Sequence, residues 1–167
     1  VFFSDDGGLT WTEPVAAAYV GEHGRCYDPG LWIDPLGRLW FYWNTYPEYG
    51  TWAAVCEDPD AETLTWLPPR KIGAEVMMNK PTVVANDCWL FPVAVWGTQV
   101  YAGGMKPSGE TERLAFVYRS SDRGETFERL GGAHIPVRAD RSFDEHMIVV
   151  LPGNVLWMLI RTRYGIA

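Results

Sequence analysis

Apolar residues occur along the chain in short runs that come in pairs, and a few residues rich in Gly, Pro, Asn and Asp separate the two runs of each pair. Runs of β-branched and aromatic residues joined by such turns are typical of β-hairpins. No stretch has the spacing of an amphipathic helix, so the pattern predicts an all-β protein with antiparallel sheets. Three hairpins are predicted, at residues 27–43, 80–93 and 145–161, with turns at 34–37, 85–87 and 151–154.

The hairpins belong to a longer repeat. Each of the first two is followed by another apolar run, at 51–56 and 114–119, and then by a turn that carries an aromatic residue. The aromatic position recurs as Trp11, Trp66 and Phe127, at intervals of 55 and 61 residues. Four strands in a period of this size fit one blade of a β-propeller. The predicted blades span residues 1–20 (partial), 21–69, 70–137 and 138–167 (partial).

One motif, Ser-x-Asp-x-Gly-x-Thr followed by Trp or Phe, occurs twice and ends at Trp11 and at Phe127. Asp6 and Asp122 are predicted to accept hydrogen bonds from the amides of a tight turn. The glycine two residues later allows a positive φ. The two aromatic side chains are then predicted to fold back as hydrophobic plugs.

This motif resembles the Asp-box, or BNR repeat, of the sialidase-like β-propellers. The resemblance implies a partial propeller of four-stranded antiparallel blades, about half of a six-bladed ring. Residues 1–167 then form a single fragment of such a domain, with Val1 inside a strand, and the chain is expected to be a piece of a longer protein. Because the motif is specific for architecture and not for chemistry, Asp6 and Asp122 are interpreted as structural and are assigned to no site.

Composition narrows the classes of partner. The chain is 47% hydrophobic and 21% charged, which indicates a folded protein. Its net charge of −7 argues against nucleic acid as a partner. Three cysteines without metal-ligand spacing predict no metal site, no cofactor is expected, and neither a membrane span nor a signal peptide is visible. Nine Trp, eight Tyr and seven Phe suit β-sheet packing and also a carbohydrate-binding surface.

Polar and aromatic residues gather where the first strand of each hairpin begins and the second ends. These points should lie at the end of each blade opposite the Asp-box turns, around one mouth of the central tunnel, where propellers commonly bind ligands. A structural role stays open for Asp28, which with Pro29 can fix a strand start, and for Lys80, which can be simply solvated. The predicted substrate-binding residues are Arg25, Asp28, Lys80, Asp144, His146, Arg163 and Tyr164.

The last hairpin is the most informative. Glu145 opens its first strand and Arg161 closes its second, so pairing across the hairpin predicts that the two side chains lie close together. The hairpin resembles the sialidase segment that carries an essential glutamate and the second arginine of the arginine triad. By this resemblance Glu145 is a catalytic base toward a tyrosine nucleophile, and Arg161 holds the substrate carboxylate through its planar fork. The alternative is a cross-strand surface ion pair.

The resemblance implies an exo-acting glycoside hydrolase of the sialidase (neuraminidase) type, which releases a terminal acidic sugar from a glycoconjugate. The other catalytic groups would lie before Val1 and after Ala167, so the fragment alone is expected to be inactive. His146 departs from the family pattern, which has small polar residues after the glutamate.

Two alternatives stay open: a propeller-fold polysaccharide lyase or rhamnosidase that uses His146 and Tyr164, and a non-catalytic carbohydrate-binding propeller. The sequence leaves the cellular location undetermined, and the resemblance implies a secreted or periplasmic protein.

Overall fold

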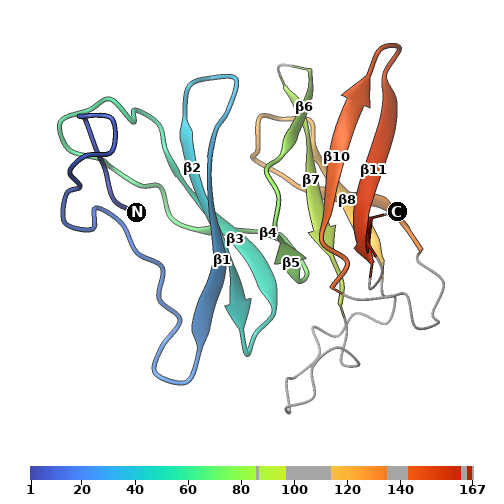
Figure 1. Cartoon of the computed structure of the whole chain (residues 1–167), viewed down its shortest axis with the longest axis horizontal. Helices are drawn as coiled ribbons and strands as arrows, with labels where there is room; N and C mark the ends of the chain where they lie inside the picture. The colour runs from blue at the N-terminus through green and yellow to red at the C-terminus, as the bar shows by residue number, and fades with distance from the viewer. Residues whose placement is uncertain (86, 97–113, 135–142, 163–164, 167) are drawn as a thin grey trace.

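The computed structural model describes residues 1–85, 87–96, 114–134, 143–162 and 165–166. Over these residues the chain forms twelve β-strands and no helix, which confirms the predicted all-β class. The strands build three antiparallel sheets that stand side by side in the order of the sequence (Figure 1).

Each sheet is formed by strands that follow one another in the chain. The first contains β1 (Arg25–Ile33), β2 (Leu39–Tyr46), β3 (Gly50–Cys56) and β4 (Arg70–Gly73). The second contains β5 (Val76–Met77), β6 (Thr82–Ala85), β7 (Cys88–Ala94), β8 (Ala115–Ser120) and β9 (Glu128–Ala133). The third contains β10 (His146–Leu151), β11 (Val155–Thr162) and β12 (Gly165–Ile166).

The three predicted hairpins are present as β1–β2, β6–β7 and β10–β11. The predicted third strands are present as β3 and β8, each starting within one residue of its expected position. With β4 and β9 added, the first two sheets each contain a succession of four antiparallel strands, and β5 pairs with β7 as an extra strand of the second sheet. The repeat inferred from the aromatic positions therefore corresponds to sheets of successive strands, but β4 belongs to the first sheet, so the predicted boundary between residues 69 and 70 lies a few residues too early.

The first twenty residues differ from the expectation. Val1 is predicted to lie inside a strand, but this segment contains no strand. It folds back on itself instead, and the Val15 amide donates to the Val1 carbonyl at 2.9 Å. Val1 and Ala16 pack against Phe41 and Trp43 of the first sheet. The segment is therefore held by side-chain packing and local hydrogen bonds, without a strand ladder.

Aromatic side chains fill the space between the first and second sheets. Trp32 and Trp40 from the first sheet meet Trp89 and Phe91 from the second, with ring centroids 5.1–6.3 Å apart. Trp89 and Phe91 are fully buried. Tilted and edge-to-face pairs of this kind add to the free energy gained by burying the rings. Phe127 packs edge-on against Phe91 at 5.1 Å, so the aromatic residue that ends the second Asp-box is indeed a plug.

The hydrogen bonds predicted for the second Asp-box are present. Asp122 Oδ1 accepts from the amides of Glu125 and Thr126, at 3.1 and 2.9 Å, and Oδ2 accepts from the Thr126 hydroxyl. Ser120 Oγ accepts from the Gly124 amide at 2.7 Å. These donors lower the pKa of Asp122 from 3.8 to about 2, the Thr126 hydroxyl most of all.

The first Asp-box has the same hydrogen bonds but a different environment. Asp6 accepts from the amides of Leu9 and Thr10, at 2.9 and 3.0 Å, and its pKa is likewise lowered, first by the Thr10 hydroxyl. Trp11, however, is 63% exposed, so its predicted role as a hydrophobic plug is wrong in this structure. The turn geometry is encoded locally, whereas a plug needs a sheet beneath it.

Replacing Asp122 with Ala is expected to lower the free energy of unfolding by about 1 kcal/mol at neutral pH, because exposed turn amides lose a charged acceptor. The carboxyl pKa is lower in the folded chain than in the unfolded one, so the contribution is complete above pH 3.8 and is lost as the pH falls toward about 2. Urea unfolding at several pH values measures it. Asp5→Ala, at an exposed position of the other turn, is the control. Equal losses for both variants at neutral pH would contradict the structural role.

Candidate functional site

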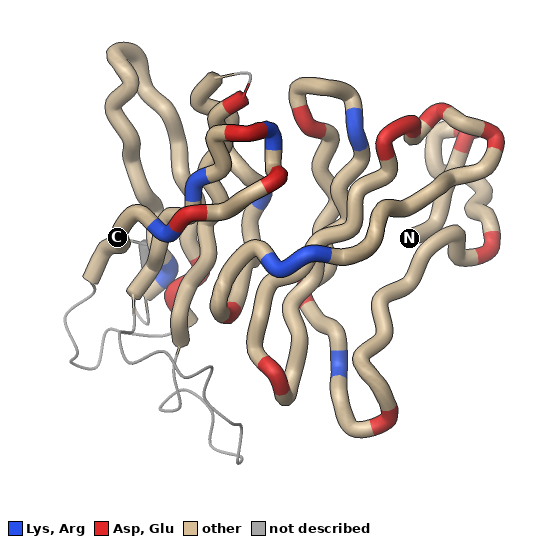
Figure 2. The backbone as a smooth tube through the Cα atoms, turned by 180° about the vertical axis from the view of Figure 1, so that it is seen from behind, with Lys and Arg blue, Asp and Glu red and all other residues tan. Residues whose placement is uncertain are grey.

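The second Asp-box turn and the first strands' starting residues lie at opposite ends of the described sheets. Ser120, where the second box begins, pairs with Trp89 at the start of β7, next to the β6–β7 turn. Arg25 pairs with Tyr46 at the far end of the β1–β2 hairpin. The first strand of each hairpin starts at the end away from the boxes (Figure 1), and charged residues lie mostly at the sheet ends and in turns (Figure 2). Within the described residues, the starts of β1, β6 and β10 therefore lie at the end of the sheets away from the second Asp-box turn.

Glu145 and Arg161 lie together, as the hairpin pairing predicts. Arg161 Nη1 donates to both carboxylate oxygens of Glu145 at 2.9 Å, and the Arg161 amide donates to the Glu145 carbonyl at 2.8 Å. The guanidinium also lies over the Phe143 ring, 5.6 Å from its centroid. The Arg161 side chain is 51% exposed, so the contacts fix its direction without covering it.

Asp28 lies at an irregularity of β1. Tyr27 faces Asn44 and Gly30 faces Tyr42, so Asp28 and Pro29 together oppose one residue of β2. Asp28 has a φ of 49°, which is uncommon for a residue with a side chain and is often found at functional sites. The expectation that Asp28 fixes a strand start is wrong, since β1 begins at Arg25 and the residue sits in a bulge within the strand.

The charges around Asp28 connect the first and third sheets. Partial burial raises the pKa of its carboxyl, the amide of Asn44 lowers it, Glu145 raises it and Arg25 lowers it. Arg25 itself is held over the Tyr27 ring, 4.9 Å from the centroid. Arg25 and Glu145 therefore both act on Asp28, and Glu145 in turn is paired with Arg161.

Asn44, where the second strand of the first hairpin ends, is one of the polar residues expected at this end of the sheet, but it is not among the predicted substrate-binding residues. It is fully buried, and its Nδ2 donates to the Met77 carbonyl at 3.2 Å and to Asp28 Oδ2 at 3.4 Å. Its Oδ1 accepts from the Met77 amide and from the Thr51 hydroxyl, both at 2.9 Å. A polar amide inside the apolar run of β2 was the available signal. Asn44 ties β1, β2, β3 and β5 together beneath Asp28.

His146 and Asp144 are buried, contrary to the expectation that they contact a ligand. The His146 ring lies between two carbonyl oxygens, with Nε2 2.8 Å from Phe116 O and Nδ1 3.2 Å from Asp144 O. Burial lowers the pKa of His146, while the two backbone contacts act in the opposite direction. The ring joins β10 to the neighbouring sheet through β8, so its position is one of packing and not of exposure to substrate.

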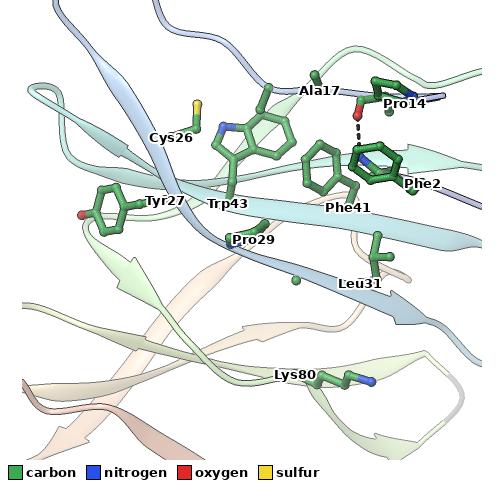
Figure 3. Close-up of a pocket in the computed structure, with 14 residues that line it drawn as sticks. Phe2, Pro14, Ala17, Cys26, Tyr27, Pro29, Leu31, Phe41, Trp43 and Lys80 are labelled. Atoms are coloured by element: carbon green, nitrogen blue, oxygen red, sulfur yellow. Dashed lines mark hydrogen bonds between the residues drawn. The ribbon is translucent and has the colours of Figure 1, made fainter. Parts of the chain in front are cut away.

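Lys80 is exposed and borders two pockets. A pocket of about 530 Å³ lies among β1, β10 and the chain before β6, with Gly30, Thr82 and Met147 in its wall. The larger pocket, about 800 Å³, is mostly apolar and lies between the N-terminal segment and the first sheet, with Tyr27 and Trp43 in its lining (Figure 3). The Lys80 side chain therefore lies beside both pockets.

Two of the predicted substrate-binding residues, Arg163 and Tyr164, lie outside the described residues.

Among the residues that are described, no group of three or more His, Cys, Asp or Glu side chains could hold a metal ion. The described part of the chain also contains no helix long and apolar enough to cross a membrane.

Comparison with models of protein families finds no match, and no curated protein matches the chain. The resemblance to the sialidase-like propellers therefore rests on the two Asp-boxes, the repeated hairpins and the Glu145–Arg161 pair.

Proposed function

We propose that this chain is part of a sialidase-like β-propeller and forms one side of a site for a terminal acidic sugar. The observation that carries the proposal is the half-exposed guanidinium of Arg161, fixed by both oxygens of Glu145 at the sheet end opposite the Asp-boxes. Arg161 is held by Glu145, and Arg25 lies in the same region. Such a group of charges suits a ligand that carries a carboxylate and hydroxyl groups.

The arrangement of the sheets supports the propeller. The first strand of the third hairpin contacts the first strand of the second: the Thr82 hydroxyl donates to the Ile148 carbonyl at 2.6 Å, and Asn79 Nδ2 donates to the His146 carbonyl at 2.8 Å. Together with the pocket between β1 and β10, these contacts bring the first strands of three hairpins around one region. Inner strands gathered around an axis are what a propeller requires.

The chemistry follows from the placement of the charges. The Arg161 hydrogen bonds to Glu145 use Nη1, and within the described residues Nε and Nη2 donate to no acceptor. The side of the guanidinium formed by Nε and Nη2 can bind the carboxylate of the sugar. In the proposed reaction, Glu145 accepts the proton of the tyrosine that attacks the anomeric carbon. Overall, water adds a hydroxyl to that carbon and a proton to the departing oxygen.

Arg161→Lys is expected to weaken binding of N-acetylneuraminic acid about tenfold, a loss of about 1.4 kcal/mol, because lysine keeps the charge but loses the planar fork. Binding of the carboxamide analogue of the same sugar should change less than about twofold. Both affinities are measured by NMR titration of the chain.

Arg119→Lys is the matched control, since Arg119 pairs with Glu128 at 2.8 Å on an exposed surface of the second sheet. Equal losses for the acid and for its carboxamide would remove the carboxylate-clamp role. Turnover of a fluorogenic sialoside, measured in parallel in a protein that includes the sequence on either side of this chain, separates a hydrolase from a binding module.

A further inference from the structure

A third pocket, of about 640 Å³, opens at the same end of the first sheet as Arg25 and Asp28. It lies between the chain before β1 and the β2–β3 turn, and its aromatic lining is Tyr19, Trp43, Tyr46, Tyr49 and Trp52. The volume is within the range of about 300–1,000 Å³ that is common for small-molecule sites. Trp43 and Tyr49 are buried, whereas Tyr19, Tyr46 and Trp52 keep part of their surface exposed.

The walls of this pocket are held in place. The rings of Tyr46 and Tyr49 pack edge-on at 6.2 Å. Lys71 Nζ donates to the Tyr49 carbonyl at 3.2 Å. Gly50 lets the walls approach, because a Cβ there would lie 2.7 Å from Lys71 Cε and 3.0 Å from Trp52 Nε1. Tyr19, by contrast, is 78% exposed, so one aromatic face is available to a ligand.

The polar groups of the pocket differ from those around Arg161. Glu22, His23 and Glu48 are exposed at its rim, and Lys71 is the lysine that borders it. Two carboxylates beside one ammonium group do not favour an anion. Carboxylates accept hydrogen bonds from hydroxyl groups, and aromatic rings cover apolar C–H faces. The combination suits a neutral sugar.

The pocket adjoins the charged region. Arg25 pairs in register with Tyr46, which lines the pocket. Arg25 is also close enough to Tyr49 to oppose the rise in the pKa of that phenol, which burial raises to about 12. A ligand that extends from the charged region past Arg25 would therefore reach this pocket.

We propose that the aromatic pocket binds the neutral sugar residues to which the terminal acidic sugar is attached. This inference rests on the function proposed above and extends it from a single sugar to an oligosaccharide of about two further residues. The chain would then prefer an acidic sugar presented on a neutral glycan over the same sugar alone.

The test is a titration of the chain with three probes: lactose, N-acetylneuraminic acid, and sialyllactose, in which the acid is joined to lactose. Binding is followed by saturation-transfer NMR and by tryptophan fluorescence. Lactose alone is expected to bind. Trp52→Ala should weaken lactose and sialyllactose at least fivefold and leave the free acid unchanged, whereas Arg161→Lys should weaken the acid and sialyllactose and leave lactose unchanged.

Two further variants keep the result interpretable. Tyr19→Ala removes an exposed ring without touching the core, so it should reproduce the loss of lactose binding even if Trp52→Ala disturbs folding. Trp157→Ala removes a tryptophan that is 61% exposed on β11 and should change nothing.

The two proposals can fail separately. Lactose that does not bind, or that binds the Tyr19 variant as well as the unaltered chain, overturns the pocket inference alone. Lactose binding that depends on Tyr19, with no binding of the free acid, overturns the acidic-sugar site and leaves the pocket for neutral sugars.

Discussion

Asn44→Ala is expected to lower the free energy of unfolding by about 3 kcal/mol. The side chain is completely buried, and its removal takes the acceptor from the Met77 amide and the Asn44 donor from the Met77 carbonyl, whereas the Thr51 hydroxyl keeps the Glu75 carbonyl as an acceptor. A buried donor left unsatisfied costs about 1–3 kcal/mol. The unsatisfied Met77 amide, the lost hydrogen bond to the Met77 carbonyl and the lost packing of the Asn44 side chain account for the expected value. Urea denaturation of the purified variant measures it.

Asn79→Ala is the matched control for Asn44. Asn79 is only partly buried and makes one hydrogen bond, to the His146 carbonyl at 2.8 Å. Its loss should therefore cost about 1 kcal/mol. If the two asparagine variants were equally stable, Asn44 would not be the link between the strands that its contacts indicate. The Asn44 variant should also weaken sugar binding, because the bulge that carries Asp28 loses its support.

Gly124→Ala is expected to destabilise the chain by about 3 kcal/mol. The glycine has a φ of 85°, and forcing a side chain into this conformation costs about 1–2 kcal/mol. A Cβ at this position would overlap the ring of Trp40 and lie 3.1 Å from that of Trp89. Both tryptophans are fully buried in the core between the first two sheets, so neither ring can move without disturbing its neighbours.

Gly8→Ala isolates the effect of packing. Gly8 occupies the same position of the first Asp-box, with a φ of 89°, but the nearest atom to an added Cβ is on Trp11, at 3.6 Å. This variant should cost only the conformational part, about 1–2 kcal/mol. Thermal unfolding of both variants gives the difference. Equal losses of unfolding free energy for the two variants would show that the second turn does not pack closely against Trp40 and Trp89.

The two Asp-boxes show which features of a turn the local sequence specifies. The same residue pattern gives the same hydrogen bonds to Asp6 and to Asp122, because all donors lie within four residues of the acceptor. The environments differ completely, since one turn packs on the aromatic core and the other is exposed. The motif specifies the hydrogen bonds within the turn, but not the residues against which the turn packs.

The pairing of Glu145 with Arg161 could be predicted for the same reason. Both residues belong to one hairpin, and the positions of its apolar runs and turn fix the register. By contrast, the bulge that gives Asp28 its positive φ depends on how β1 meets β2 and on the contacts of Asn44 with β3 and β5.

The sequence by itself determined the all-β class, the three hairpins, the two turns and the ion pair, because each depends on residues near one another in the chain or on one strand register. Only the tertiary structure decided that His146 is buried against the Phe116 carbonyl, that Asn44 joins four strands, and that aromatic residues from two segments line a pocket beside Arg25. Burial and pocket shape arise where distant segments meet, and no local pattern specifies which segments these are.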